Sequence, residues 1–376
     1  MSSPYQRLAA LLVVGALGLG PSAAAADTVT IGLAQSITGG SPALYGIEQK
    51  NAAELAVDEA NAAKLLGDRK IQLVHLDDGA DRGQTVNVFQ RLIGRDKVVA
   101  IIGPTLSTGA FAADPIAQKA GVPVVAASNT ASGVTDIGDY IFRVSPPEDR
   151  VTPGVLKTVV DRFKVKRVAQ IYGIDDQLTK SAYNTQKKAL EALGVEIVAT
   201  ETFQRGDVEF AAQLTKIKAA QPDLIVLGSL AEESAGILRQ ARQLGIPKEV
   251  VFVGTQSSIS SKFFELAGPA AEGLIAGTAW YIDSPEPKNQ EFVKKYEARF
   301  GRKPDIYSAY GYDAASLVIN AIKEAGSGDR KAVRDNLAKT KNFPGVLGPI
   351  GFDAGREPVI DPKILVASGG RFVIFK

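Results

Sequence analysis

The feature that most constrains this fold is a regular alternation of short apolar runs with stretches of helical period. The runs are rich in β-branched residues and apolar at successive positions, as buried strands of a parallel sheet require when helices cover both faces. The stretches between them place apolar residues on one helix face, as in Ala52, Leu55, Ala56 and Ala60. A second such stretch contains Ala211, Leu214 and Ile217, and Asp207 is the predicted cap of its helix. The alternation predicts an α/β fold built from doubly wound parallel sheets. The runs are Val29 to Ala34, Ile71 to Leu76, Val98 to Ile102, Val122 to Ala126, Val168 to Ile171, Leu224 to Leu227 and Val250 to Val253.

The N-terminus is typical of a secretory signal peptide. Arg7 precedes an apolar run from Leu8 to Gly20, and the small residues that follow include Ala24 and Ala26, which form an Ala-x-Ala cleavage site. The run is shorter than the roughly 20 residues that span a membrane. We therefore expect residues 1–26 to be removed and the mature protein, from Asp27, to be exported to the periplasm without being embedded in the membrane.

The length of the chain predicts two lobes. Removal of 26 residues from 376 leaves 350, and single cores rarely grow beyond about 250 residues. The α/β pattern is interrupted at Arg143 to Glu148, at Thr278 to Pro287 and at Asp353 to Pro362. We interpret these interruptions as three crossings of one hinge. The predicted division is 27–147 plus 281–357 for lobe 1, and 148–280 plus 358–376 for lobe 2.

Composition excludes several classes of function. The mature chain carries one basic residue fewer than the 43 of the whole sequence, against 41 acidic residues, so its net charge is near +1. This balance argues against nucleic acid as a partner. The sequence has no cysteine and one histidine, so no thiolate chemistry and no zinc site are expected. We predict neither a cofactor nor a metal.

Enzyme motifs are also missing from the sequence. It contains no phosphate-binding Gly-Lys-Ser/Thr loop, no G-x-S-x-G elbow and no G-x-G-x-x-G after the first strand. His75 lies within a predicted strand, where a structural role is expected. Asp77, Asp78 and Asp81 lack the glycine and the distal glutamate of a calcium loop, and they are expected to end a strand and cap the next helix.

Small polar residues follow two neighbouring predicted strands. The segment from Ile101 to Gly109 holds Ser107 at the start of a helix, and the segment from Val124 to Thr130 ends in Ser128, Asn129 and Thr130. Hydroxyls and free N–H groups at the carboxyl ends of parallel strands can bind an anion. Serine and threonine also cap helices in many proteins, and the residues alone leave both interpretations open.

Several segments together resemble one known family. They are Ile101 to Gly109, Ala120 to Val124 with its following turn, Phe142-Arg143, Leu238 to Arg242 and Tyr310 to Ala315. In their joint order they are similar to the periplasmic leucine/isoleucine/valine-binding proteins of ABC transporters. The similarity covers essentially the whole mature chain. It implies a type I periplasmic binding fold, with two lobes that close on a ligand.

The resemblance assigns a carboxylate site to lobe 1. It implies that Ser107 and Thr130 bind the ligand carboxylate, together with backbone N–H groups and Ser128 between them. It also implies that Tyr45 covers the ligand. These implications favour the anion-binding interpretation of the two turns over simple capping.

Lobe 2 departs from the family pattern at three positions. The resemblance places Gln177 and Leu230 where tyrosines are usual, and Gln256 where a glutamate pairs with the ligand ammonium. Gln256 cannot neutralise an enclosed ammonium, which costs several kcal/mol without a counter-charge. The ligand could therefore be an aromatic or 2-oxo acid without an amino group. Asp175, Asp176 or Glu232 could instead supply the missing charge, so an amino acid stays open.

The resulting hypothesis is a non-catalytic solute-binding protein that acts as a monomer. Its lobes close on a small carboxylate, and the closed form is recognised by ABC transporter permease subunits. One alternative is a sensing subunit that is read by a membrane receptor. Another is a secreted α/β hydrolase acting through Ser107, which the absence of a nearby base disfavours.

Overall fold

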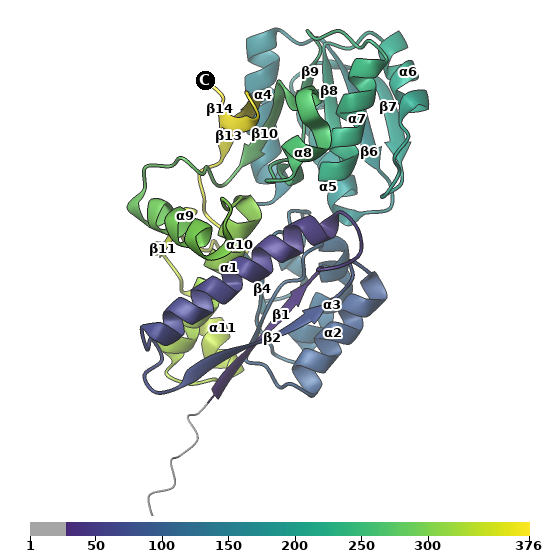
Figure 1. The fold of residues 1–376 in the computed structure, drawn as a ribbon. Helices are drawn as coiled ribbons and strands as arrows, with labels where there is room; N and C mark the ends of the chain where they lie inside the picture. The colour runs from purple at the N-terminus through teal and green to yellow at the C-terminus, as the bar shows by residue number, and fades with distance from the viewer. Residues whose placement is uncertain (1–27) are drawn as a thin grey trace, which may run out of the picture.

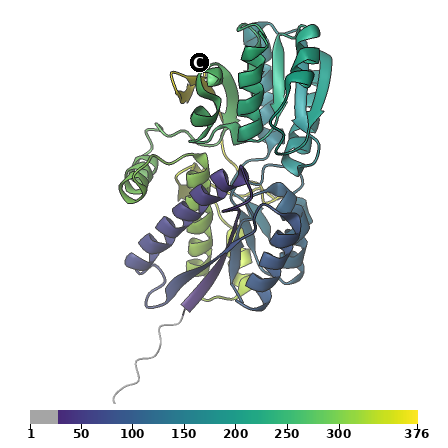
Figure 2. The same cartoon turned by 45° about the vertical axis from the view of Figure 1, so that its right-hand side comes forward.

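The alternating pattern forms two separate sheets, each flanked by helices (Figures 1 and 2). The computed structural model describes residues 28–376. The predicted signal peptide, 1–26, lies outside the described residues. The two lobes are stacked along the long axis of the molecule, and several chain segments pass between them (Figure 1). Both the α/β class and the two-lobed type I arrangement are as the sequence predicts.

The sheet of lobe 1 is entirely parallel, with the strand order β2-β1-β3-β4-β5. Strands β3 and β4 are buried at every position, which explains their unbroken apolar sequence. The strands are β1 (Thr28–Gln35), β2 (Lys70–Asp77), β3 (Ala100–Ile102), β4 (Val124–Ala126) and β5 (Ile141–Arg143).

Helices from both ends of the chain cover this sheet. The long helix α1 packs closely on α10, where a Cβ on Gly311 would lie only 2.4 Å from the carbonyl oxygen of Gln49. Asp81 caps α2 by accepting a hydrogen bond from the N–H of Gln84, as predicted. The elements are α1 (Pro42–Ala62), α2 (Arg82–Gly94), α3 (Ser107–Lys119), η1 (Thr135–Ile137), α9 (Pro287–Phe300), α10 (Ile306–Ala325), α11 (Arg330–Ala338), β11 (Phe343–Gly345) and β12 (Gly348–Ile350).

The sheet of lobe 2 has the strand order β14-β13-β10-β9-β8-β6-β7. Its central strands are parallel, and the C-terminal hairpin of β13 and β14 adds two antiparallel strands at one edge. The strands are β6 (Arg167–Gly173), β7 (Glu196–Phe203), β8 (Leu224–Gly228), β9 (Val251–Val253), β10 (Leu274–Thr278), β13 (Lys363–Ser368) and β14 (Arg371–Ile374).

One predicted cap in lobe 2 is wrong. Helix α6 begins after Phe210, and the carboxylate of Asp207 instead accepts a 2.8 Å hydrogen bond from the N–H of Gln204. Asp207 therefore closes a turn before the helix rather than capping it. The elements of lobe 2 are α4 (Glu148–Phe163), α5 (Gln177–Ala192), α6 (Ala211–Ala219), α7 (Ala231–Gln243), η2 (Gln256–Ser258), α8 (Phe263–Ala267) and η3 (Gly268–Ala271).

The chain changes sheet after β5, after β10 and before β13. The residue numbers proposed for the lobe boundaries remain a prediction. Trp280 lies in the second crossing, where its Nε1–H donates a 2.6 Å hydrogen bond to Asn289, so it packs the hinge. Within residues 28–376, no helix combines the length and the apolar character needed to cross a membrane.

Candidate ligand-binding site

The predicted site residues lie where the loops of the two lobes face each other. In lobe 1 these loops follow β1, β3 and β4, and in lobe 2 they follow β6, β8 and β9. All of them leave the carboxyl ends of parallel strands, which is where open α/β sheets bind ligands. Direct hydrogen bonds connect the two sets of loops, so the lobes are in contact.

Helix α3 in lobe 1 begins at Ser107 and leaves its first N–H groups without a side-chain cap. The N-cap residue is Leu106, which cannot accept a hydrogen bond through its side chain. The buried hydroxyl of Ser107 accepts a 3.3 Å hydrogen bond from the N–H of Ala131. This contact holds the start of α3 beside the turn that follows β4. An uncapped helix N-terminus is a favourable position for a carboxylate.

The turn after β4 contains one engaged hydroxyl and one unengaged hydroxyl. Ser128 accepts a 2.6 Å hydrogen bond from the side-chain amide of Gln49 and donates to the carbonyl of Thr105 at 2.8 Å. Thr130 is 3 % exposed, and its hydroxyl makes no well-formed hydrogen bond, although it faces the Glu148 carboxylate and acts to lower the pKa of that group. Buried polar groups are nearly always paired. We therefore expect the Thr130 hydroxyl to gain a hydrogen-bond partner when a ligand binds.

Arg143 fixes the shape of the turn that follows β4. Its guanidinium is fully buried and donates to the carbonyls of Asn129 and Ala131 at 2.6 and 2.7 Å. The remaining N–H groups form a two-pronged pair with Glu357 in the third crossing, at 2.6 and 2.5 Å. The turn is therefore tied to the hinge through one buried ion pair.

Tyr45 links the two lobes directly. It lies near the N-terminal end of α1, which points toward lobe 2 in Figure 1, and its ring stacks on Tyr307 with centroids 4.3 Å apart. Its hydroxyl accepts a 2.8 Å hydrogen bond from the N–H of Ala231, the first residue of α7. Burial raises the pKa of Tyr45 far above its ordinary value, so the hydroxyl stays neutral. Tyr45, the residue predicted to cover the ligand, thus contacts helix α7 of lobe 2.

Gln177 and Leu230 stand at the starts of two helices of lobe 2. Leu230 is the buried N-cap residue of α7. The N–H of Gln177 donates to the hydroxyl of Thr108 at 3.0 Å, and that hydroxyl donates to Asp176 at 2.7 Å. Gln177 also lines a cavity of about 350 Å³ together with Ala131 and other residues of both lobes. These contacts place the two predicted residues at the interface between the lobes.

Gln256 lies in the third loop of lobe 2 and is buried. Its amide oxygen accepts a 3.0 Å hydrogen bond from the hydroxyl of Tyr310, and its Nε2 donates to the carbonyl of Pro146 at 3.0 Å. The same Nε2 lies 3.4 Å from a carboxylate oxygen of Glu148. Glu148 is therefore the acid that faces Gln256, and the sequence analysis did not identify it as a site residue.

The three acids considered from the sequence are placed differently. Asp176 caps α5 by accepting hydrogen bonds from the N–H groups of Leu178 and Thr179. Asp175 accepts a 2.8 Å bond from the N–H of Arg205, and Glu232 is exposed. Two of the three acids are thus already hydrogen-bonded within lobe 2.

Among the described residues, the hydrogen-bond partner of the Ser107 hydroxyl is not suited to act as a catalytic base. The Ser107 hydroxyl contacts a backbone N–H, and His75 lies in β2, which β1 separates from β3. Burial lowers the pKa of His75, so the ring is neutral. The geometry lends no support to a hydrolase.

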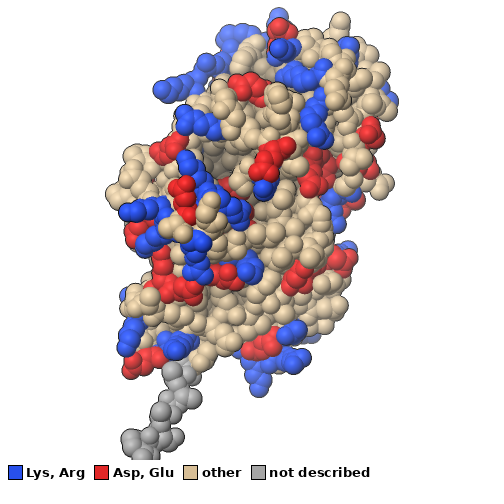
Figure 3. Space-filling model, viewed as in Figure 1, with Lys and Arg blue, Asp and Glu red and all other residues tan. Residues whose placement is uncertain are grey.

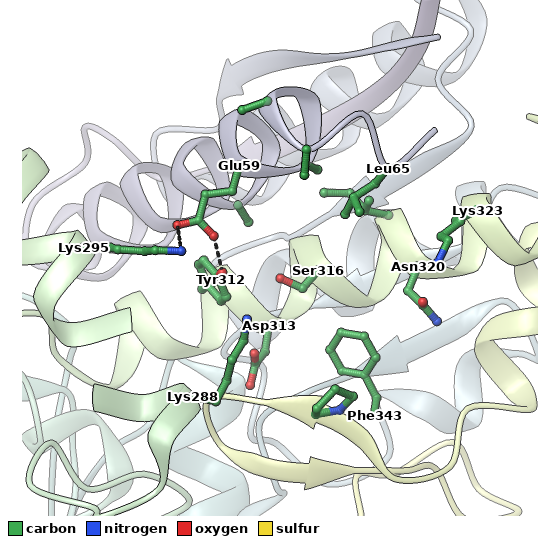
Figure 4. A pocket seen from close by; sticks show the side chains of 16 residues that line it. Glu59, Leu65, Lys288, Lys295, Tyr312, Asp313, Ser316, Asn320, Lys323 and Phe343 are labelled. Atoms are coloured by element: carbon green, nitrogen blue, oxygen red, sulfur yellow. Dashed lines mark hydrogen bonds and ion pairs between the residues drawn. The ribbon is translucent and has the colours of Figure 1, made fainter. Parts of the chain in front are cut away.

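A larger groove of about 510 Å³ lies on lobe 1 between α1, α9, α10 and β11, away from the predicted site residues (Figure 4). Two of its charged side chains, Glu59 and Lys295, are paired with each other. Glu59 accepts a 2.6 Å hydrogen bond from the hydroxyl of Tyr312 and lies 3.1 Å from Lys295. On the face shown in Figure 3, acidic and basic side chains are interspersed. This surface does not form a one-sign patch of the kind that binds a polyanion.

Comparison with known proteins identifies the family of this chain. The sequence profile of the periplasmic binding protein family matches residues 28–366. A "Leucine-, isoleucine-, valine-, threonine-, and alanine-binding protein" of Pseudomonas aeruginosa is 29 % identical over 356 residues, which cover 94 % of this chain and 93 % of the relative.

Two solved structures are similar over nearly the whole chain. A branched-chain amino acid transporter substrate binding protein from Streptococcus pneumoniae, in complex with isoleucine, is 31 % identical, with a TM-score of 0.86 and coverage of 92 % of this chain and 98 % of that one. A solute binding protein of an ABC transporter from Rhodopseudomonas palustris, in complex with 3,4-dihydroxy benzoic acid, is 27 % identical, with a TM-score of 0.83 and coverage of 92 % and 95 %. On this evidence the chain belongs to the periplasmic binding protein family, and its relatives are solute-binding proteins.

Proposed function

We propose that this protein is the periplasmic solute-binding component of an ABC transporter. It captures a small organic carboxylate between its two lobes and presents the closed form, as a monomer, to permease subunits. It performs no catalysis and needs neither a cofactor nor a metal. The ligand is either a branched-chain type of amino acid or an aromatic or 2-oxo acid.

One observation carries the carboxylate assignment. The hydroxyl of Thr130, which makes no well-formed hydrogen bond, belongs to the turn that Ser107 holds beside the uncapped start of α3. A carboxylate placed there would accept hydrogen bonds from the Thr130 hydroxyl and from free N–H groups. Hydrogen bonds to a charged group contribute about 1.5–3 kcal/mol each, more than bonds between neutral groups.

The remaining predicted residues would enclose the ligand from lobe 2 and from helix α1 of lobe 1. Tyr45 would cover it, while Gln177, Leu230 and Gln256 would approach it as the lobes close. Ser128 would contribute its backbone, because its hydroxyl is already engaged by Gln49 and Thr105. Closure would exclude water and strengthen the hydrogen bonds to the carboxylate.

The relatives support both ligand classes. The Streptococcus pneumoniae protein was solved with isoleucine, and the Rhodopseudomonas palustris protein with 3,4-dihydroxy benzoic acid. A fold of this kind thus accommodates carboxylates with and without an amino group.

A thermal-shift panel on the mature protein, from Asp27 onward, tests this function. The panel contains branched-chain amino acids, benzoates, cinnamates, 2-oxo acids and neutral sugars. A true ligand at 100 times its dissociation constant stabilises the fold by about 2.7 kcal/mol. We expect at least one carboxylate to raise the melting temperature of the wild type and to have a much smaller effect on Thr130→Val. Stabilisation by sugars alone, or by no carboxylate, would overturn the proposal.

A further inference from the structure

A cavity of about 220 Å³ lies at the hinge, where parts of both lobes and the second crossing meet. Lobe 2 contributes α8 and the hairpin of β13 and β14, and lobe 1 contributes the start of α10 (Figure 1). The residues predicted to bind the solute, all of them described by the structure, do not line this cavity. The candidate ligand-binding site therefore does not account for it.

The wall of the hinge cavity is largely aromatic and aliphatic. Phe264 of α8 and Phe372 of β14 have ring centroids 4.9 Å apart. Trp280 and Tyr281 of the second crossing also line the cavity, and the 2.6 Å bond from the indole N–H to Asn289 holds Trp280 in place. Apolar cavities of about 150 Å³ bind benzene. The larger hinge cavity thus has room for one substituted benzene ring.

One buried hydroxyl in this wall has no partner. Ser260 is 4 % exposed, and its Oγ makes no hydrogen bond within residues 28–376. Nearly all buried polar atoms in proteins are hydrogen-bonded, so the Ser260 hydroxyl has the capacity to pair with a ligand in the cavity. A hydroxyl group on the ligand suits it, because each of the two hydroxyls can donate and accept.

The charged groups around the cavity favour an uncharged ligand. Asp305 is buried, and its carboxylate already accepts hydrogen bonds from the N–H of Ser261 and from the first turn of α10. The cations that line the cavity, Lys303 and Arg371, are exposed, and Arg371 lies 3.8 Å from Asp283. A carboxylate in the cavity would therefore lie near a buried acid without gaining a buried cation, which is costly. An ammonium would find the Asp305 oxygens already occupied.

We propose that the hinge cavity is a second ligand site, which binds a small uncharged aromatic molecule with one hydroxyl group, of the phenol class. The ring of this ligand packs against Phe264, Trp280 and Phe372, and its hydroxyl pairs with Ser260. The site goes beyond the proposed solute-binding function and does not depend on it.

The position of the hinge site couples it to lobe closure. Its walls come from both lobes, in an arrangement in which Tyr45 and Thr108 bridge the lobes across the cleft. A ligand that contacts the walls of both lobes binds this arrangement best and shifts the population toward it. A solute that closes the cleft and a phenol at the hinge should then raise each other's affinity by the same factor. This coupling, unlike the site itself, rests on the proposed function.

The test uses Trp280 as its reporter, because it is the only tryptophan of the chain and lines the cavity. Three probes share one ring and differ in one group: p-cresol carries a hydroxyl, toluene lacks it, and 4-methylbenzoate carries a charge instead. Fluorescence titrations use the mature wild type, Ser260→Ala and a control, Ser368→Ala, which removes an exposed hydroxyl from the hairpin of β13 and β14. We expect p-cresol to change the Trp280 emission saturably and 4-methylbenzoate not to displace it.

The two serine variants should respond differently. Ser260→Ala should weaken p-cresol binding by about 3- to 10-fold, as the loss of one neutral hydrogen bond requires, and should leave toluene binding nearly unchanged. Ser368→Ala should change neither. Saturation with p-cresol should also tighten, by about fivefold or more, the binding of the carboxylate that most stabilises the wild type in the thermal-shift panel.

The site is overturned if p-cresol leaves the Trp280 emission unchanged, if toluene binds the wild type as tightly as p-cresol, or if Ser260→Ala binds p-cresol unchanged. Displacement of p-cresol by 4-methylbenzoate would overturn the assignment of an uncharged ligand. If p-cresol binds as expected but solute affinity does not change, the coupling is wrong while the site stands. If no carboxylate of the panel binds, the proposed function fails, and the p-cresol titrations still decide the hinge site. Should Ser260→Ala not fold, the wild-type comparison of p-cresol with toluene decides.

Discussion

The hydroxyl of Tyr45 in lobe 1 accepts a 2.8 Å hydrogen bond from the backbone N–H of Ala231 in lobe 2. Ala231 is the first residue of α7, so its N–H has no partner within the helix and is free to make this bond. The hydroxyl of Thr108 makes a second bridge to Asp176. The two lobes are thus joined across the cleft by side chains as well as by the hinge.

Tyr45→Phe should shift the unliganded protein toward an open form. The substitution keeps the ring that stacks on Tyr307 and removes only the hydroxyl, which contributes about 0.5–1.5 kcal/mol as a neutral hydrogen bond. Small-angle X-ray scattering should show a larger radius of gyration. Tyr172→Phe is the control, because that ring stacks on Tyr183 within lobe 2. An unchanged radius for Tyr45→Phe would show that this bond does not hold the lobes together.

Ser128→Ala and Thr130→Val should separate a structural hydroxyl from a binding hydroxyl. Loss of the Ser128 hydroxyl leaves the amide of Gln49 unpaired, so unfolding free energy should fall by about 1–3 kcal/mol. Thr130→Val removes a hydroxyl that makes no well-formed hydrogen bond, so stability should hold while carboxylate affinity falls about tenfold or more. Urea unfolding and titration calorimetry measure the two effects. The reverse pattern would contradict the assigned roles.

The Arg143–Glu357 pair should matter far more than the Arg150–Asp353 pair. Arg143→Met leaves a buried carboxylate without its partner and should lower the unfolding free energy by about 3–5 kcal/mol. Arg150→Ala removes a partly exposed pair and should cost no more than about 1 kcal/mol. Adding Glu357→Gln to Arg143→Met should restore part of the loss. Equal effects of the two single variants in urea unfolding would contradict this account.

Asp114 should make stability depend on pH. It is fully buried in α3, neither carboxylate oxygen has a partner, and burial raises its pKa well above the ordinary value. The folded state therefore keeps a proton on Asp114 that the unfolded chain loses above about pH 4. The unfolding free energy falls as the pH rises toward the pKa of Asp114 in the folded protein, by at most about 1.4 kcal/mol per pH unit.

Asp114→Asn replaces the titratable carboxyl group with a neutral amide. The unfolding free energy of the variant, relative to wild type, should increase from pH 5 to pH 8 in denaturant titrations. Asp68→Asn, at a carboxylate that is 99 % exposed, is the matched control and should show no such trend. A constant difference between Asp114→Asn and wild type would show that the Asp114 carboxylate is not buried as described.

The apolar runs predicted β1, β2, β3, β4, β6, β8 and β9, because a buried strand is apolar at consecutive residues, but they did not include β5 or β7. Ala100 to Ile102 and Val124 to Ala126 are buried throughout, as their unbroken apolar sequence required. The prediction that Asp207 caps α6 is wrong because its carboxylate accepts a hydrogen bond from the N–H of Gln204 instead. An aspartate side chain can accept from a turn N–H as well as from a helix N-terminus. Local sequence does not distinguish the two.

The candidate site was less predictable, since its contacts join distant parts of the chain. Tyr45 and Ala231 are 186 positions apart, and Glu148 and Gln256 are 108 apart. The resemblance placed Ser107 and Thr130 in neighbouring turns, but it drew attention to the acids near Gln177 and Leu230. A glutamate in the first turn of a helix has an ordinary local explanation through the helix dipole. The burial of Glu148 against Gln256 results from the packing of distant segments, which local sequence does not predict.

The central claim is that a carboxylate anchors the ligand in lobe 1. The most direct test is calorimetric titration of the mature protein with carboxylates and their neutral amides, leucine against leucinamide and benzoate against benzamide. If a carboxylate accepts the charged hydrogen bonds at α3 and Thr130, its amide should bind at least about 100-fold more weakly. Amides that bind as tightly as the acids would contradict the claim, because the anchoring group would then lie elsewhere on the ligand.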